Sequence, residues 1–276
     1  MSTPFHPTDP RLQTNQHGWN QRTPHHLASG FYNLAAFKDG ADSLNATELS
    51  LLGDVAGKRL LHLQCHFGQD TLSLQRRGAH CTGIDFSETA IAAARELTNE
   101  LGLSARFLQT DLYRLKETEL TAGSFDIVFT SYGVLCWLPD LQPWAELIAH
   151  YLAPGGRFVL VEFHPMVNCL KDGELGKLAF PYFALGDAAE HYINEGTYTD
   201  PGAPLRFEEY NWNHPIGEVC TQLLGAGLQI THLQEYPYTH YNYLTGLHQT
   251  APGQWQFRGM ERQVAMLFSV VAEKPA

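Results

Sequence analysis

Residues 59–70 read RLLHLQCHFGQD, and this stretch decides the fold. An apolar run ends in a turn that contains Gly68 and passes into a segment with helical character. A second apolar run over residues 80–85 follows and ends in Asp85. A strand, a turn, a helix and a second strand in this order form the βαβ unit of a parallel sheet.

The same alternation continues along the chain toward the C-terminus. Strands that are apolar nearly throughout, each followed by a helix, indicate a parallel sheet covered on both faces. The last two strands are joined by a non-helical connection, which predicts an antiparallel terminal hairpin. We expect strands at 59–64, 80–85, 105–109, 125–131, 157–163, 228–235 and 265–273, and helices at 46–53, 70–77, 87–101, 141–152 and 215–226.

Changes in composition divide the chain into four parts. Residues 1–26 contain Pro and Gly breaks among many Gln, Asn and Thr, which predicts an irregular N-terminal arm. Residues 27–165 form the predicted ligand-binding core. Residues 166–215 are rich in Gly, Pro, Tyr, Phe and acids, and we expect an inserted lid or small substrate subdomain there. Residues 216–276 return to the core sheet.

The charge balance argues against polyanionic partners. Eighteen Lys and Arg against 29 Asp and Glu give a net charge of −11, so neither nucleic acid nor an anionic membrane is expected as a partner. The five cysteines are odd in number and form no CxxC pair, which is typical of reduced thiols. No secretory signal or bilayer-spanning run is evident, and we expect a cytoplasmic protein. The sequence predicts no oligomeric state.

Two carboxylates follow strands where open α/β sheets bind ligands. Asp85 is placed to accept hydrogen bonds from both hydroxyls of a ribose, and Asp111 can accept from the exocyclic amine of adenine. Each acid can also be a helix N-cap or a turn residue. A fourth motif, FDIVFTSYG, covers residues 125–133, and a Pro-Gly-Gly turn at 154–156 precedes the next strand.

In order and spacing these five motifs resemble those of the class I S-adenosylmethionine-dependent methyltransferases, over about residues 57–162. The runs LHLQCHFG (61–68), GVLCWLPDL (133–141) and EFHP (162–165) are similar to those of a bacterial subgroup of that superfamily. The resemblance implies a Rossmann-like, seven-stranded, mostly parallel sheet with a terminal antiparallel hairpin. It also implies S-adenosyl-L-methionine as the cofactor.

The resemblance carries cofactor roles onto particular residues. The 64–68 turn would border the methionyl part, Asp85 would hold the ribose and Phe86 the adenine ring. Asp111 and the backbone of Leu112 would meet the adenine edge, and the Ser131 carbonyl the α-ammonium. The segment 31–33 is expected to cap the cofactor. The predicted cofactor-binding residues are Tyr32, Gln64, Cys65, His66, Gly68, Asp85, Phe86, Ser87, Asp111, Leu112 and Ser131.

The first turn departs from the superfamily pattern of an acid followed by three glycines. His62 occupies the acid position, Gln64 and His66 occupy two glycine positions, and only Gly68 remains. Glycine permits positive φ and close approach of the backbone to a ligand. Gln64 and His66 therefore take ordinary dihedral angles or accept strain, and their side chains are expected to help hold the amino-acid end of the cofactor.

Four residues are candidates for a catalytic base, needed only if the nucleophile arrives protonated: His164, Tyr132, His66 and Tyr198. His66 lies in the ligand turn and His164 follows a strand at its carboxyl end, although each can instead hydrogen-bond a backbone carbonyl. No metal signature is present, and no metal is required.

Three functions remain open at this point. The first is transfer of a methyl group to O, N or C of a small molecule, in which the enzyme orients the nucleophile in line with the S–CH₃ bond. The second is intramolecular displacement, in which the altered turn bends the methionine onto itself and methylthioadenosine leaves. The third is a catalytically silent cofactor-binding protein.

Overall fold

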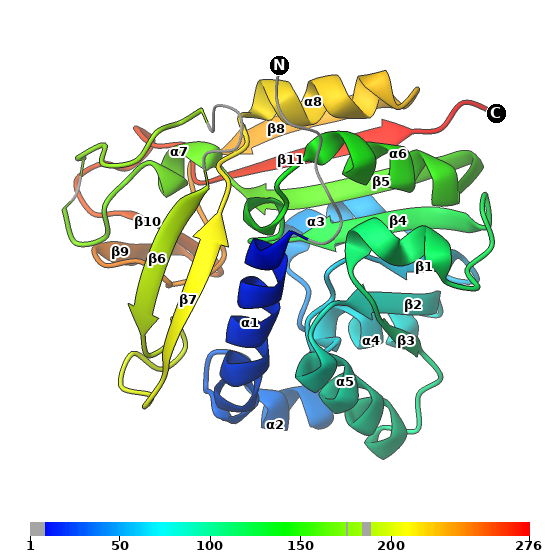
Figure 1. Ribbon diagram of the computed structural model, residues 1–276, viewed down its shortest axis with the longest axis horizontal. Coiled ribbons are helices and arrows are strands. Elements are labelled where there is room, and N and C mark those ends of the chain that lie inside the picture. Colours follow the sequence, from blue (N-terminus) through cyan, green and yellow to red (C-terminus); the bar gives the residue numbers. More distant parts are fainter. Residues whose placement is uncertain (1–8, 175, 184–188) are drawn as a thin grey trace.

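The computed structural model describes residues 9–174, 176–183 and 189–276. Its centre is a seven-stranded sheet with the order β3-β2-β1-β4-β5-β11-β8 (Figure 1). The neighbouring pairs from β3 to β5 are parallel, and β11 is antiparallel to both β5 and β8. The predicted Rossmann-like fold with a terminal antiparallel hairpin is confirmed. The strands are β1 (Arg59–His62), β2 (His80–Asp85), β3 (Arg106–Gln109), β4 (Phe125–Ser131), β5 (Leu152–Phe163), β8 (Gln229–Tyr236) and β11 (Leu267–Glu273).

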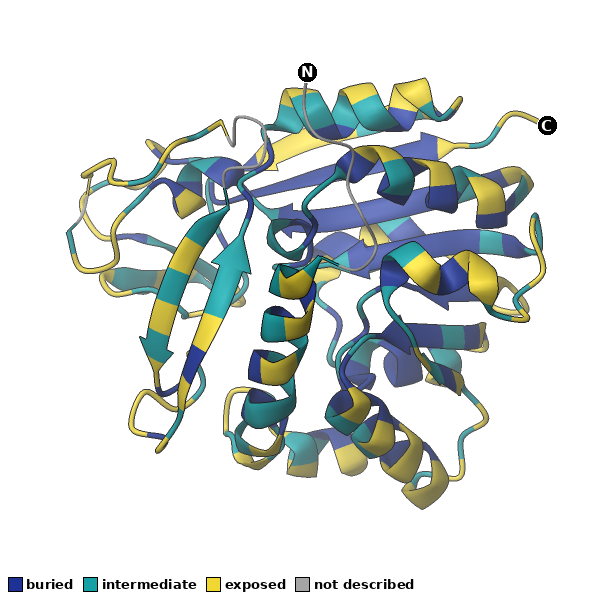
Figure 2. Cartoon of the chain, viewed as in Figure 1, coloured by how far each residue is buried: buried dark blue, intermediate teal, exposed yellow. Residues whose placement is uncertain are grey.

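Helices cover both faces of this sheet, so its inner strands are mostly buried, whereas the edge strands β3 and β8 are partly exposed (Figure 2). On one face, α6 (Leu141–Tyr151) and α8 (Ile216–Gly225) pack through Trp144 and Leu223. On the other face lie α3 (Ala46–Leu52), α4 (Gln69–Arg76) and α5 (Glu88–Glu100). This two-sided burial explains why the strands are apolar nearly throughout. The remaining short helices are α2 (Leu34–Lys38), η1 (Leu112–Glu117), η2 (Leu135–Trp137) and α7 (Pro165–Asn168).

The N-terminal arm is not irregular, contrary to the prediction. Over its described part it forms α1 (Pro10–Ala28), while residues 1–8 lie outside the described residues. The Asp9 side chain caps the helix by accepting from the Arg11 N–H at 2.9 Å, and Pro10 occupies the first turn. The intrinsic helix propensity of this polar segment does not predict a helix, and contacts with the rest of the protein stabilise it.

Two small antiparallel hairpins lie beside the sheet. Strands β6 (Glu190–Glu195) and β7 (Arg206–Asn211) fall within the segment expected to be an inserted lid. Helix α1 lies between this hairpin and α5 (Figure 1). The Asn15 amide donates to the Tyr210 carbonyl and accepts from the Tyr210 N–H, both at 2.8 Å, so α1 and β7 are joined directly. Strands β9 (Leu247–Ala251) and β10 (Gln254–Phe257) form the second hairpin.

Candidate functional site

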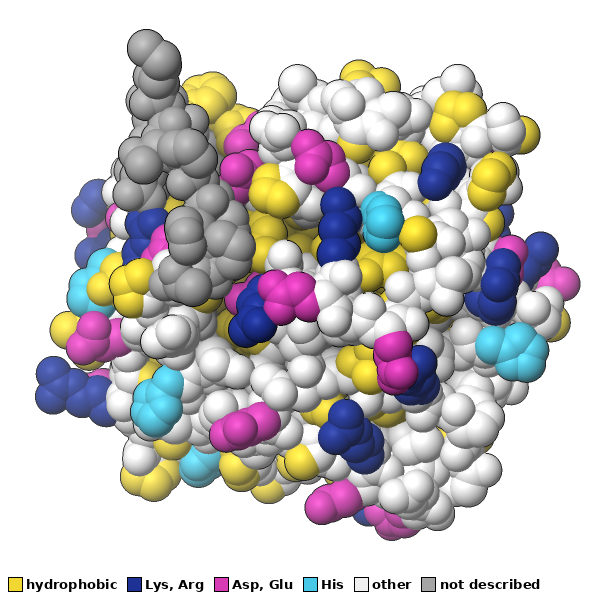
Figure 3. Space-filling model, turned by 45° about the vertical axis from the view of Figure 1, so that its right-hand side comes forward, with side chains coloured by type: hydrophobic (Ala, Val, Ile, Leu, Met, Phe, Trp, Pro, Cys, Tyr) yellow, Lys and Arg dark blue, Asp and Glu magenta, His cyan; other side chains and the backbone are white. Residues whose placement is uncertain are grey.

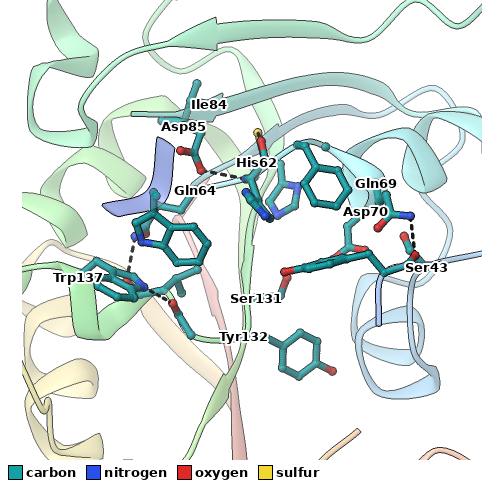
Figure 4. Close-up of a pocket in the computed structure, with 18 of the residues that line it drawn as sticks. Ser43, His62, Gln64, Gln69, Asp70, Ile84, Asp85, Ser131, Tyr132 and Trp137 are labelled. Atoms are coloured by element: carbon teal, nitrogen blue, oxygen red, sulfur yellow. Dashed lines mark hydrogen bonds between the residues drawn. The ribbon is translucent and has the colours of Figure 1, made fainter. Parts of the chain in front are cut away.

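A cavity of about 450 Å³ opens at the carboxyl ends of β1, β2 and β4. Open α/β sheets bind ligands at this edge, and the volume lies within the range of small-molecule sites. Asp85 and Gln64 lie on one side of the cavity and Asp70 and Ser43 on the other (Figure 4). Among the described residues that line it there are four aspartates and no Lys or Arg.

The first turn accepts backbone strain. Gln64 and His66 have φ of 53° and 51°, so the glycine positions keep glycine-like conformations although they carry side chains. The Gln64 amide donates to the Val134 carbonyl at 2.9 Å. The Gln64 Oε1 atom is buried and has no hydrogen-bond partner among the described residues. A ligand N–H at this turn would therefore meet an unused acceptor.

His66 belongs to a hydrogen-bonded chain that leaves the turn. Its Nε2 lies 3.0 Å from His26 Nδ1 on α1, and His26 Nε2 lies 2.7 Å from the Thr197 hydroxyl. Burial lowers the pKa of His66 well below its ordinary value and that of His26 to about 3. Both imidazoles are therefore neutral near pH 7 and act as hydrogen-bonding groups.

Asp85 lies at the end of β2 and is buried beside the turn. Its carboxylate accepts from the His66 N–H at 2.9 Å and from the Ser87 N–H at 2.8 Å. Burial raises the pKa of Asp85 to about 6. The Phe86 N–H is a third backbone partner of this carboxylate, and the lone-pair capacity that remains faces the cavity. Ser87 is buried as the N-cap of α5 and is not among the lining residues.

Asp111 both lines the cavity and caps a helix. Its side chain accepts from the Tyr113 N–H at 2.8 Å at the start of η1, and burial raises its pKa. Asp111 is thus a helix N-cap, as one of its two interpretations expected. It also lies on the cavity wall, where a ligand can contact it. Nine further residues of the predicted cofactor set line the same cavity: Tyr32, Gln64, Cys65, His66, Gly68, Asp85, Phe86, Leu112 and Ser131.

Comparison with known proteins agrees with this geometry. Residues 60–156 match the methyltransferase domain family. A demethylmenaquinone methyltransferase of Thermus thermophilus is 36% identical over 122 residues, which cover 44% of this chain and 53% of that protein. The predicted resemblance to the class I S-adenosylmethionine-dependent methyltransferase superfamily is thereby confirmed over residues 60–156. The expected cofactor and enzyme class are confirmed at the level of this superfamily.

Other relatives extend beyond the methyltransferase domain. An uncharacterized protein of Haemophilus influenzae is 27% identical over 191 residues, which cover 68% of this chain and 74% of that protein. The crystal structure of an S-adenosylmethionine-dependent methyltransferase from Mesorhizobium loti superposes with a TM-score of 0.56 at 21% identity, covering 86% of this chain and all of that one. This likeness shows the fold. The chain spans about half the length of the Thermus methyltransferase that it matches.

Of the four predicted catalytic residues, His164 lies outside the cavity. Its Nδ1 accepts from the Met166 N–H at 3.0 Å and caps α7, and its Nε2 lies 2.7 Å from the Glu235 carboxylate. Both ring nitrogens are therefore engaged away from the site. His66, Tyr132 and Tyr198 do line the cavity.

Tyr132 follows β4 with a φ of 49°, a left-handed conformation that is rare for a residue with a side chain. Its hydroxyl donates to Glu48 Oε2 at 2.6 Å. Burial and the neighbouring Glu48 carboxylate raise the pKa of Tyr132 well above its ordinary value. Glu48 was missed by the sequence analysis because it lies on α3, before the first recognisable motif.

Asp70 is a second residue that motif reasoning missed. It lines the cavity from the first turn of α4, and the hydroxyls of Ser43 and Ser131 hydrogen-bond its carboxyl group. Burial raises its pKa to about 7, and the acids Glu48 and Asp42 add to the shift. The sequence feature that could have indicated Asp70 is its position two residues after Gly68, in the first turn of the helix that follows the ligand turn.

Two segments far apart in sequence close over the cavity. The hydroxyls of Tyr32, beside α2, and Tyr198, in the insert, hydrogen-bond each other. Trp19 of α1 packs edge-on against His66 and Trp137, with ring centroids 5.1 and 5.3 Å apart. The Tyr32 ring also lies 5.5 Å from the His26 ring of α1, so the predicted cap at 31–33 meets both α1 and the insert.

In the ranges that the structure describes, no helix is both long and apolar enough to cross a bilayer. The described side chains also contain no group of three or more His, Cys, Asp or Glu with the geometry of a metal site. On the face shown in Figure 3, acidic and basic side chains are interspersed.

Proposed function

We propose that this protein transfers the methyl group of S-adenosylmethionine to a small uncharged molecule. The observation that carries the proposal is a single cavity bordered both by the superfamily's cofactor motifs and by a cluster of aromatic side chains. Donor and acceptor would share this cavity, which is what an in-line displacement requires.

The residues present fit the cofactor. The unused Gln64 Oε1 suits a donor such as the α-ammonium, and the Asp85 carboxylate, which lines the cavity at the end of β2, suits the ribose hydroxyls. Phe86 and Leu112 would border the adenine ring. When bound, the cofactor supplies a methyl group already activated by the sulfonium, so the protein's own task is orientation and exclusion of water.

The acceptor would occupy the aromatic part of the cavity, which we call the aromatic compartment: Phe31, Tyr132, Phe163, Tyr198, Tyr241 and Tyr243. Phe31 and Tyr241 are stacked at 5.5 Å, and the rings of Phe163 and Tyr243 lie 4.5 Å apart. Such rings favour a flat, apolar acceptor. With no Lys or Arg among the described lining residues, an anionic acceptor would lack a counter-charge. The name of the Thermus relative, which acts on a demethylmenaquinone, supports a small-molecule acceptor.

Calorimetry with S-adenosylhomocysteine tests the cofactor assignment. The wild type should bind, and Asp85→Ala should bind about 10- to 100-fold more weakly, because hydrogen bonds to a charged group contribute about 1.5–3 kcal/mol. Glu96→Gln, at an exposed position of α5, is the control and should bind like the wild type. Absence of binding to the wild type would disprove the assignment.

Incubation with labelled S-adenosylmethionine tests the reaction. Adenosylhomocysteine that forms only when an acceptor is present supports methyl transfer. Methylthioadenosine released without any acceptor would instead establish the intramolecular reaction. Tight cofactor binding with neither product, across a broad set of acceptors, would identify a silent binding protein.

A further inference from the structure

A buried carboxylate stands behind the aromatic compartment and is joined to it by one tyrosine. Tyr132 lines the cavity, whereas Glu48 does not line it and is completely buried. We propose that the acceptor is an aromatic hydroxyl compound whose hydroxyl proton passes through Tyr132 to Glu48. This inference rests on the proposed methyl transfer and names its substrate class and its proton path.

The hydrogen bonds give the path a direction. The Tyr132 hydroxyl donates its proton to Glu48 Oε2 at 2.6 Å, so its oxygen can still accept from a donor in the cavity. An acceptor hydroxyl bound there would complete a chain from the cavity through the tyrosine to the carboxylate. The left-handed backbone of Tyr132 supports this role, because strained residues cluster at functional sites.

Glu48 is held in one orientation by its own helix. Its Oε1 accepts from the Asn45 N–H at 2.8 Å and from Asn45 Nδ2 at 3.0 Å, in a capping box at the start of α3. Asn45 Nδ2 also donates to the Tyr241 hydroxyl at 3.1 Å. Oε2 is thereby left facing Tyr132, and the path does not depend on a side-chain rotation.

Other titratable groups lie around this pair. Asp70 approaches from α4, and Tyr241 and His240 approach from the loop that follows β8. His240 Nε2 lies 2.8 Å from the Thr47 hydroxyl, next to Glu48 in sequence. Asp70 is the competing proton acceptor, since it also lines the cavity and is close enough to Tyr132 to affect its titration.

Charge and shape together favour a hydroxyl group on an aromatic ring. A carboxylate or phosphate would find no Lys or Arg among the described lining residues. A protonated amine would be repelled by the sulfonium that it must approach, and it has no free electron pair with which to attack. An aromatic hydroxyl compound enters uncharged, and its ring suits the stacked Phe31 and Tyr241 side chains.

The step balances. The acceptor oxygen forms a bond to the methyl carbon while the carbon–sulfur bond breaks and its electron pair returns to sulfur. The acceptor proton moves to the Tyr132 oxygen, and the Tyr132 proton moves to Glu48 Oε2. The products are the aryl methyl ether, adenosylhomocysteine and a neutral Glu48, whose proton returns through Tyr132 to water in the cavity after the products leave.

Binding tests the substrate class without turnover. In protein saturated with S-adenosylhomocysteine, we expect 4-methylphenol to bind at least about 10-fold more tightly than 4-methylanisole, which has no proton to donate. We expect no measurable binding of 4-methylbenzoate, which would find no counter-charge among the described lining residues. In Glu48→Gln and in Tyr132→Phe the preference for the phenol over its ether should fall to about 3-fold or less.

Kinetics test the proton path. Gln at position 48 can still accept from Asn45, so Glu48→Gln should fold and bind S-adenosylhomocysteine normally while methyl transfer to 4-methylphenol falls about 100-fold. Tyr132→Phe should show a similar loss, and the double variant should be no slower than either single variant. The loss of methyl transfer in Glu48→Gln should exceed the loss in Asp70→Asn.

The outcomes are separable. Failure of the wild type to bind S-adenosylhomocysteine would overturn the proposed function itself. With that binding intact, the inference is overturned if 4-methylphenol does not bind, or if the benzoate binds better. It is also overturned if Asp70→Asn slows methyl transfer more than Glu48→Gln does, which would move the proton acceptor to Asp70.

Discussion

At the scale of single residues, backbone strain concentrates on the cavity wall. Gln64, His66 and Tyr132 all have positive φ without being glycine. Such conformations cost roughly 1–3 kcal/mol each and persist only where surrounding contacts fix them. Gln64 is fixed by the Val134 carbonyl and Tyr132 by Glu48. This part of the wall is therefore preorganised before any ligand binds.

Asp70 makes the stability of the unliganded protein depend on pH. Burial raises its pKa from 3.8 to about 7, so between about pH 4 and 7 the folded state keeps a proton that the unfolded state has lost. Its contribution to stability is therefore lost as the pH rises through that window. Asp70→Asn does not titrate, and it should gain at least about 1 kcal/mol over the wild type between pH 5 and 8, or roughly 2–4 °C in Tm.

Thermal unfolding of the two proteins at both pH values measures this difference. The exposed variant Glu96→Gln should keep the same Tm offset from the wild type at pH 5 and pH 8. An Asp70→Asn offset that does not change with pH would show that the Asp70 carboxyl group is ionised in the folded protein at pH 5.

At the scale of elements, the sequence was most informative where burial is two-sided. The predicted bounds of β2 and β4 agree with the structure, since both are short apolar runs between polar turns. Helix α1 was missed because its apolar pattern is weak and tertiary contacts hold it. The Asp9–Pro10 pair was the available signal, as a capping acid before a first-turn proline often begins a helix.

One buried arginine on that helix should control its docking. The Arg22 guanidinium lies 4.2 Å from the centre of the Trp19 ring, 4.4 Å from that of Phe207, and 3.1 Å from the Glu209 carboxylate on β7. Removal of one partner from a buried ion pair leaves the other charge uncompensated. Arg22→Ala should therefore lower the free energy of unfolding by about 3–5 kcal/mol.

Chemical denaturation measures this loss, and hydrogen exchange of the α1 amides should accelerate with it. The double variant Arg22→Met, Glu209→Leu is the matched control, because it replaces the pair by apolar groups of similar size. It should recover most of the lost stability. If the double variant is as unstable as Arg22→Ala, the ion pair is not what holds α1.

At the scale of the whole molecule, the site is assembled from segments that are distant in sequence. The cofactor turn could be predicted because its residues are contiguous. The contacts of Tyr32 with Tyr198 and of Tyr132 with Glu48 could not, since they depend on how separate segments pack on the sheet. His164 shows the converse: it follows a strand at the ligand edge, yet its side chain caps α7 instead of entering the cavity.

Because α1, the first turn and the insert share this cavity, a ligand should stabilise all three together. At a concentration 100 times its Kd, S-adenosylhomocysteine should add about 2.7 kcal/mol, or roughly 5–10 °C in Tm. Hydrogen exchange should slow in α1, in residues 64–68 and around Tyr198. In Tyr198→Phe, which cannot complete the hydrogen bond to Tyr32, protection should persist at 64–68 and weaken around position 198. Protection confined to 64–68 in the wild type would show that α1 and the insert do not respond to the cofactor.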